Sequence, residues 1–244
     1  MATPTAQLTS APSAERIAKR GVIQLGFWMA SLTALVAGVF AASGVATPAR
    51  SGPFCANACI PSPYVDVAKF IPGDYLWLVP GILLAPIFVG LMASIHSYAP
   101  ESNKAFSRIS LSFAVIYAVV IIVNYFVQLT VVMPSLQSGE TQGLSLFTQY
   151  NPHGFFIALE VLAYIAMSAA FLAAAPVFAG GRVEWTIRWL FALSFPLALA
   201  AFVGFWLLGH DLVAVEVSVL MIDWLVLIVG GALLSIVFWR ADRA

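Results

Sequence analysis

Six long apolar runs restrict the folds that this chain can adopt. They cover residues 22–46, 76–98, 109–133, 153–178, 187–208 and 212–239. Each run is long enough to cross the hydrocarbon core of a bilayer as a helix, which takes about 20 residues. None alternates between apolar and polar residues as a barrel strand does. The sequence therefore predicts an all-α fold, a polytopic membrane bundle of six transmembrane helices.

The scarcity of charge supports this prediction. Of the 244 residues, 61% are hydrophobic and 9% are charged, whereas soluble domains contain about 25% charged residues. A net charge of zero gives no basic footprint for nucleic acid, so the lipid bilayer is the expected partner and nucleic acid is not. We predict one membrane domain over residues 22–239, a disordered N-terminal tail over 1–21 and a short C-terminal tail over 240–244.

The first run follows Arg16, Lys19 and Arg20, which is also how a signal peptide begins. Its apolar length of about 25 residues exceeds the roughly 7–15 residues of a signal core. We therefore expect it to be retained as a span.

The positive charges predict the orientation of the bundle. Two of the eleven Lys and Arg residues, Arg50 and Lys69, fall in the first long loop. The other nine fall on the side of both termini: Arg16, Lys19, Arg20, Lys104, Arg108, Arg182, Arg188, Arg240 and Arg243. Because positive residues concentrate in cytoplasmic loops, we predict cytoplasmic termini in a multi-pass protein of the cell inner membrane.

Two cysteines mark the opposite side. Cys55 and Cys59 lie in the first outer loop, where an even number of cysteines on the oxidising side favours a disulfide. The alternative is two free thiols. Their spacing differs from the C-x-x-C of thiol oxidoreductases, so we do not expect redox catalysis.

A small-residue stripe, Ala30, Ala34, Gly38 and Ala42, recurs at four-residue spacing in the first span. Small side chains let two helix backbones approach closely. The stripe either packs against a neighbour within the bundle or forms the face of a homo-oligomer or of a partner membrane subunit.

Polar residues concentrate in the outer halves of three spans. Seven of them are candidate ligand-binding residues: Asn124, Gln128, His153, Glu160, Tyr164, Glu216 and Asp223. At about 1.5 Å per residue, Glu160 lies roughly 10 Å and Asp223 roughly 16 Å below the outer ends of their spans. Ionisable groups at such depths usually face the bundle interior or a water-filled cavity. The predicted spans contain no Lys or Arg before Arg188 near the inner end of the fifth. A bound cation, a proton or a substrate amine is therefore the expected counter-ion.

Structural alternatives exist for part of this set. Asn124 and Gln128 would then hydrogen-bond to neighbouring helices, and Glu216 would lie at headgroup level beside His210 and Asp211.

The layout resembles that of uncharacterised six-span bacterial inner-membrane proteins in its size, its spans and its acidic residue in the fourth span, Glu160. It is also similar to the substrate-binding subunit of energy-coupling vitamin transporters, small six-span proteins without an ATPase of their own. That resemblance implies a partner subunit docked on the small-residue stripe.

Three functions follow as hypotheses. The first is transport or small-ligand binding in an outward-facing polar cavity that contains Glu160 and Asp223. The second is a non-catalytic accessory subunit of a larger complex. The third is an intramembrane enzyme on a lipid-like substrate, with Glu160 and Asp223 as acid and base. No hydrolase or zinc-protease motif occurs, and Lys19, Lys69 and Lys104 lie outside the spans, which excludes a retinal Schiff base. We expect neither a cofactor nor a metal.

Overall fold

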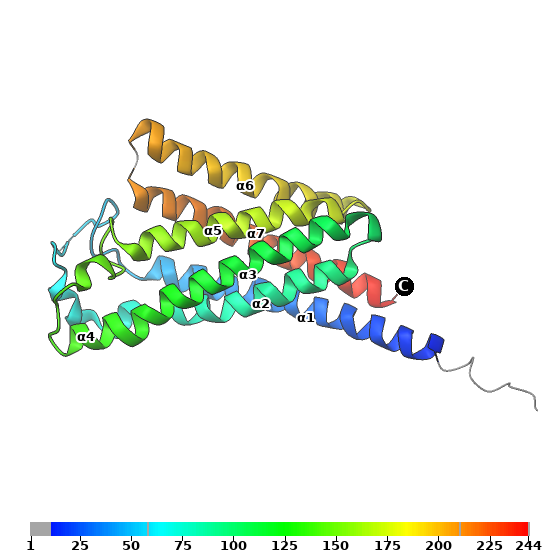
Figure 1. Ribbon diagram of the computed structural model, residues 1–244, viewed down its shortest axis with the longest axis horizontal. Coiled ribbons are helices and arrows are strands. Elements are labelled where there is room, and N and C mark those ends of the chain that lie inside the picture. The colour runs from blue at the N-terminus through cyan, green and yellow to red at the C-terminus, as the bar shows by residue number, and fades with distance from the viewer. Residues whose placement is uncertain (1–10, 58, 210, 244) are drawn as a thin grey trace, which may run out of the picture.

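The computed structural model describes residues 11–57, 59–209 and 211–243, and this part of the chain is a bundle of helices without strands (Figure 1). Six helical segments are long and apolar enough to cross a membrane, which confirms the predicted fold class of a multi-pass membrane protein. The α-helices are α1 (Ala11–Ala46), α2 (Leu78–Tyr98), α3 (Lys104–Val127), α4 (Met133–Gln137), α5 (Phe155–Ala174), α6 (Arg182–Leu208) and α7 (Leu212–Arg243).

Helix α1 begins earlier than the apolar run predicts. It starts at Ala11, whereas the apolar run begins at residue 22 and the tail was predicted to reach residue 21. Residues 1–10 lie outside the described part. The segment before the span is rich in Ala, Arg, Lys and Glu, which are good helix formers, and it can continue the helix into water. Arg20 Nε donates to Asp242 Oδ1 over 3.2 Å, which ties this extension to the end of α7.

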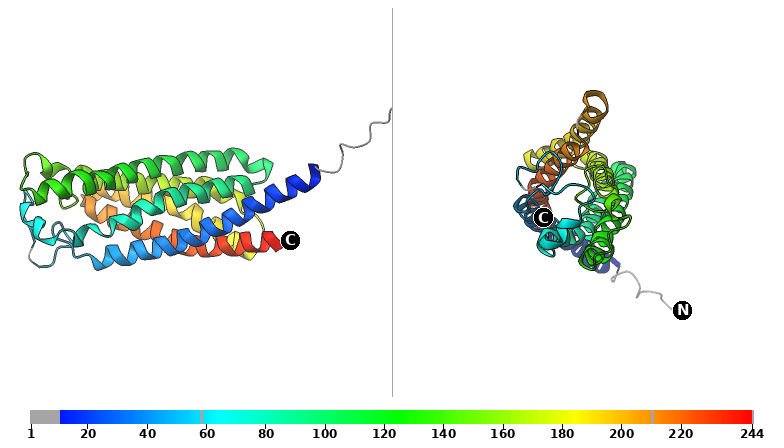
Figure 2. Two further views of the ribbon diagram at one scale, coloured as in Figure 1. Left: turned by 90° about the horizontal axis from the view of Figure 1, so that it is seen from below. Right: turned by 90° about the vertical axis from the view of Figure 1, so that its left-hand side faces the viewer.

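The two ends of the bundle differ in character. The start of α1, the end of α7 and the α2–α3 connection lie at one end (Figure 2). The long segment between α1 and α2 and the short helix α4 lie at the other. Cys55 and Cys59 belong to that second end and form a disulfide with a Cα–Cα distance of 5.8 Å, which confirms the predicted bond. We call this the outer end.

The first half of the small-residue stripe, Ala30 and Ala34, packs against a helix of the same chain. A Cβ on Gly231 of α7 would lie 2.9 Å from the Ala30 carbonyl oxygen and 3.0 Å from the Ala34 nitrogen of α1. The backbones of α1 and α7 therefore touch there, as the within-bundle alternative predicts. A Cβ on Gly38 would meet nothing within 4 Å, and Ala42 is exposed. A partner on that half of the stripe stays a prediction.

Candidate functional site

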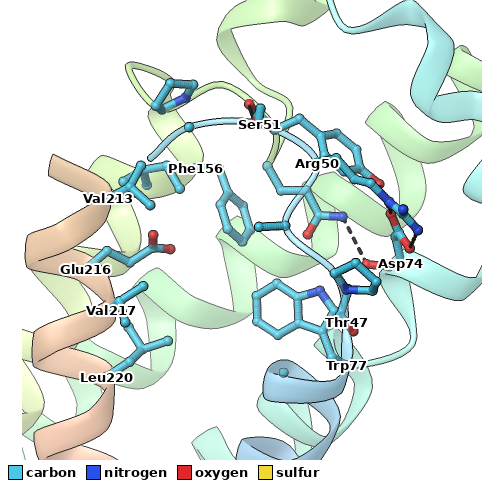
Figure 3. A pocket seen from close by; sticks show the side chains of 18 of the residues that line it. Thr47, Arg50, Ser51, Asp74, Trp77, Phe156, Val213, Glu216, Val217 and Leu220 are labelled. Atoms are coloured by element: carbon cyan, nitrogen blue, oxygen red, sulfur yellow. Dashed lines mark hydrogen bonds and ion pairs between the residues drawn. The ribbon is translucent and has the colours of Figure 1, made fainter. Parts of the chain in front are cut away.

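A pocket of about 290 Å³ opens at the outer end of the bundle (Figure 3). Its volume lies near the lower limit of the roughly 300–1,000 Å³ that is typical of ligand sites, so it suits a small molecule. Its lining includes Gly44, Arg50, Asp74, Trp77, Gln149, Tyr150, Phe156, Glu216, Leu220 and Trp224. They come from the end of α1, from the segments between α1 and α2 and between α4 and α5 (the two outer loops), from the first turn of α5 and from the first four turns of α7. We call this cavity the outer pocket.

Aromatic rings form much of its inner wall. Trp77 meets Phe156 edge to face, with the ring centroids 6.1 Å apart. Behind them, Phe40 of α1 stacks on Trp77 at 5.7 Å and meets the edge of Trp224 at 5.2 Å. Gly44 leaves room for Trp224, because a Cβ there would lie 3.0 Å from its ring. Three aromatic side chains from α5, α7 and the segment before α2 therefore line one small cavity.

One acidic side chain reaches into this aromatic pocket. Glu216 projects from α7 toward Phe156 (Figure 3), and the residue is 7% exposed. Its carboxyl lies close to the carboxyl of Glu160 on α5. Glu160 is fully buried and accepts a hydrogen bond from the hydroxyl of Tyr125 on α3. We refer to Glu160 and Glu216 as the carboxyl pair, with Glu216 on the pocket side.

The outer rim holds a second acidic residue that is already paired. Arg50 Nε and Nη2 donate to the two carboxylate oxygens of Asp74 over 2.9 and 3.1 Å. The guanidinium also lies 3.6 Å above the ring of Phe70. The hydrogen bonds to Asp74 raise the pKa of Arg50. The guanidinium of Arg50 is therefore paired with Asp74 and does not neutralise Glu216.

Tyr150 and Gln149 complete the rim around Asp74. The Tyr150 hydroxyl donates to Asp74 Oδ2 over 3.4 Å, and Gln149 Nε2 donates to the Asp74 carbonyl over 3.1 Å. Burial raises the pKa of the Tyr150 hydroxyl, so this group remains a neutral donor. Ser51 donates to the Tyr150 carbonyl. We call Arg50, Asp74, Gln149 and Tyr150 the rim network, because it joins the two outer loops above the pocket.

Two of the predicted ligand-binding residues form hydrogen bonds with main-chain groups instead. Asn124 Nδ2 donates to the Phe156 carbonyl over 3.0 Å. Gln128, where a π-helical turn (Gln128–Val132) follows α3, donates to the Phe147 carbonyl and accepts from Gln149 N. These contacts match the alternative in which both amides hold neighbouring segments. By fixing Phe156 and Gln149 they support the pocket from behind.

The remaining predicted residues lie at different depths in the bundle. The side chain of His153 is exposed and lies outside the pocket lining. His210 lies outside the described residues. Asp223 is fully buried and accepts a hydrogen bond from Ser168 Oγ over 2.8 Å. Seven residues separate it from Glu216, which places it about 10 Å deeper along α7. Tyr164 is also fully buried and lies outside the pocket lining.

The aromatic wall and the rim were not among the predicted site residues. Trp77, Phe156 and Tyr125 look like ordinary span residues, because aromatic side chains are common in apolar helices and at membrane interfaces. Trp224 gave the clearest signal, since it falls near the middle of a predicted span, away from the headgroup level that tryptophan favours. Arg50 and Asp74 are 24 residues apart, so no local pattern joins them.

A glycine on α2 controls the placement of Tyr125. A Cβ on Gly81 would lie 2.4 Å from Tyr125 Cε2 and 3.1 Å from the Phe40 ring. We expect Gly81→Ala to push Tyr125 away from Glu160 and to lower the free energy of unfolding by about 1–3 kcal/mol, as overpacking does. Denaturant unfolding in detergent, followed by tryptophan fluorescence, measures the change.

Gly90→Ala is the matched control on the same helix. A Cβ at Gly90 would meet the sulfur of Met29 at 2.8 Å, and a methionine side chain can move aside at little cost. A loss in Gly90→Ala as large as that in Gly81→Ala would contradict the role assigned to Tyr125.

Comparison with known proteins gives no relative from which to transfer a function. No protein-family model matches the chain, and searches of curated proteins and of solved structures found no match.

Proposed function

We propose that this membrane protein binds a small organic cation with an apolar body in the outer pocket. The observation that carries the proposal is a buried carboxyl, Glu216, that faces a cavity walled by Trp77, Phe156 and Trp224. The faces of aromatic rings attract cations, and such cages are a known way of binding quaternary ammonium groups. A ligand cation would supply the charge partner that Glu216 lacks.

The charges around the pocket favour a cation over an anion. Arg50 is the one Lys or Arg among the described residues that line it, and its Nε and Nη2 donate to the carboxylate of Asp74. An anionic ligand would therefore face Glu216 without a free positive partner. The side chains that line the pocket around Glu216 are apolar, which suits the hydrocarbon part of an amphipathic amine; they are Phe156, Ile157, Val213, Val217 and Leu220.

A binding experiment with matched probes tests the charge requirement. The purified protein in mild detergent would be titrated with 2-phenylethylammonium and with 2-phenylethanol, a neutral molecule of similar shape. Trp77 and Trp224 line the pocket, so intrinsic fluorescence reports occupancy. We expect Glu216→Gln to weaken binding of the ammonium probe roughly tenfold or more, since a hydrogen bond to a charged group contributes about 1.5–3 kcal/mol. Binding of the alcohol should change little.

Glu140→Gln is the control, because it removes an exposed acidic residue at the same end of the molecule. This variant should bind both probes as the unmodified protein does. Equal affinities for the two probes in the unmodified protein, or unchanged ammonium binding in Glu216→Gln, would overturn the proposal.

A further inference from the structure

The carboxyl pair contains a buried oxygen that lacks a donor. Glu160 Oε1 accepts from the Tyr125 hydroxyl, while Glu160 Oε2 has no hydrogen-bond partner of its own among the described residues. The carboxyl of Glu216 lies nearby. A buried polar atom left unpaired is costly, and such atoms in folded proteins call for an explanation.

A proton on Glu160 Oε2 provides that explanation. An ionised carboxylate can only accept hydrogen bonds, whereas a protonated carboxyl can also donate one. With its proton on Oε2, Glu160 accepts from Tyr125 through Oε1 and donates to Glu216 through Oε2. A neutral carboxylic acid that serves as a donor is a known arrangement in buried sites. In that protonation state Glu160 would be a neutral donor available to Glu216.

The other charged and titratable groups do not neutralise Glu216. Asp211, before α7, is a further acid near it, and α1 contributes Gly44 and Val45 to the pocket. The remaining groups are Tyr117 and Tyr125 on α3, Tyr164 on α5, Asp223 on α7, and Asp74, Arg50 and Tyr150 of the rim network. Because Arg50 is held by Asp74, a buried charge on Glu216 has no cationic partner among the described residues when the pocket is empty, and unpaired buried charges are strongly disfavoured.

We propose that Glu216 exchanges its proton for the ligand's cation, so that one proton leaves to the outer side for each cation bound. This inference rests on the proposed function and adds its coupling to protons. The O–H bond of Glu216 breaks, the proton passes to water at the outer opening of the pocket, and the cation stays intact beside the new carboxylate. Glu160 keeps its own proton and donates it to that carboxylate. The charge of the buried site is the same before and after exchange.

Calorimetry with benzyltrimethylammonium tests the exchange. This cation carries no ionisable proton, so any proton released comes from the protein. Titrations in two buffers of different ionisation enthalpy give the number of protons released. We expect about one per bound cation, and an affinity that falls roughly tenfold for each unit by which the pH is lowered, while Glu216 is protonated in the empty site.

Variants of Glu160 test its part as a donor. The amide of Gln can donate to Glu216 as the protonated acid does, so Glu160→Gln should keep the proton release and an affinity near that of the unmodified protein. Glu160→Leu has no donor and should bind the cation roughly tenfold more weakly, as the loss of a hydrogen bond to a charge predicts. Asp223→Asn, which removes the deeper acid of α7, should leave the proton release unchanged.

The possible failures are distinct. Cation binding without proton release, with an affinity that does not depend on pH, would overturn the exchange and leave the proposed function standing. Loss of release in Asp223→Asn or in Glu160→Gln, with binding retained, would assign the exchanging carboxyl to one of those residues and overturn the role of Glu216. No binding of either cationic probe to the unmodified protein would overturn both proposals.

Discussion

Gly231→Leu is expected to lower the free energy of unfolding by about 3 kcal/mol, at the upper end of the usual cost of overpacking. The reason is the kind of atom that the new side chain meets. A Cβ at this position lies 2.9 Å from a backbone oxygen and 3.0 Å from a backbone nitrogen of α1. A backbone cannot rotate aside as a side chain can, so α1 and α7 must separate along their contact. The thermal denaturation midpoint in detergent and the urea unfolding curve both measure the loss.

Gly38→Leu is the matched control for this substitution. Gly38 belongs to the same small-residue stripe, but its Cβ would enter open space. The change from Gly to Leu in a helix interior is favourable by about 1 kcal/mol, so this variant should be as stable as the unmodified protein or slightly more so. A large loss in Gly38→Leu, together with a change in the mass of the detergent-solubilised protein, would instead indicate that a second copy or another subunit covers this half of the stripe.

Hydropathy predicted the spans well because burial in lipid imposes one strong requirement on each of them. A run of apolar residues of sufficient length must form a helix there, since its backbone has no water to bond. The ends of α2 and α7 therefore fall close to the limits of their apolar runs. The start of α1 does not, because the residues before its apolar run are polar and helical, and hydropathy carries no information on helix formation in water.

The candidate site was predictable in part, and the reason is again physical. Glu160 and Glu216 stand out because a carboxyl in an apolar run needs a partner. Sequence cannot say which partner, and the structure groups these two with each other rather than grouping Glu160 with Asp223. Asn124 and Gln128 carry the same polar signal, yet they bond to backbone carbonyls. Trp77 and Phe156 give no signal, because an aromatic residue that lines a cavity has the same composition as one that faces lipid.

Asp74→Ala is expected to lower the free energy of unfolding by about 2 kcal/mol, because it leaves a partly buried guanidinium without its partner. Breaking a fully buried ion pair costs about 3–5 kcal/mol. The smaller figure applies here, because the side chain of Arg50 is 21% exposed while that of Asp74 is 7% exposed. The same substitution removes the acceptor of the Tyr150 hydroxyl, so both outer loops lose their common partner.

A double-mutant cycle separates the ion pair from the rest of the rim network. Arg50→Met keeps an apolar side chain of similar length and removes the charge, so Asp74→Ala should cost less in that background if the pair carries the effect. Asp66→Ala, an exposed acid in the same outer segment, should cost less than about 0.5 kcal/mol. Additive losses in the cycle would show that Asp74 acts through Tyr150 and the backbone instead. In either case the rim network lines the pocket, so Asp74→Ala should also speed dissociation of a bound ammonium probe, which stopped-flow displacement measures directly.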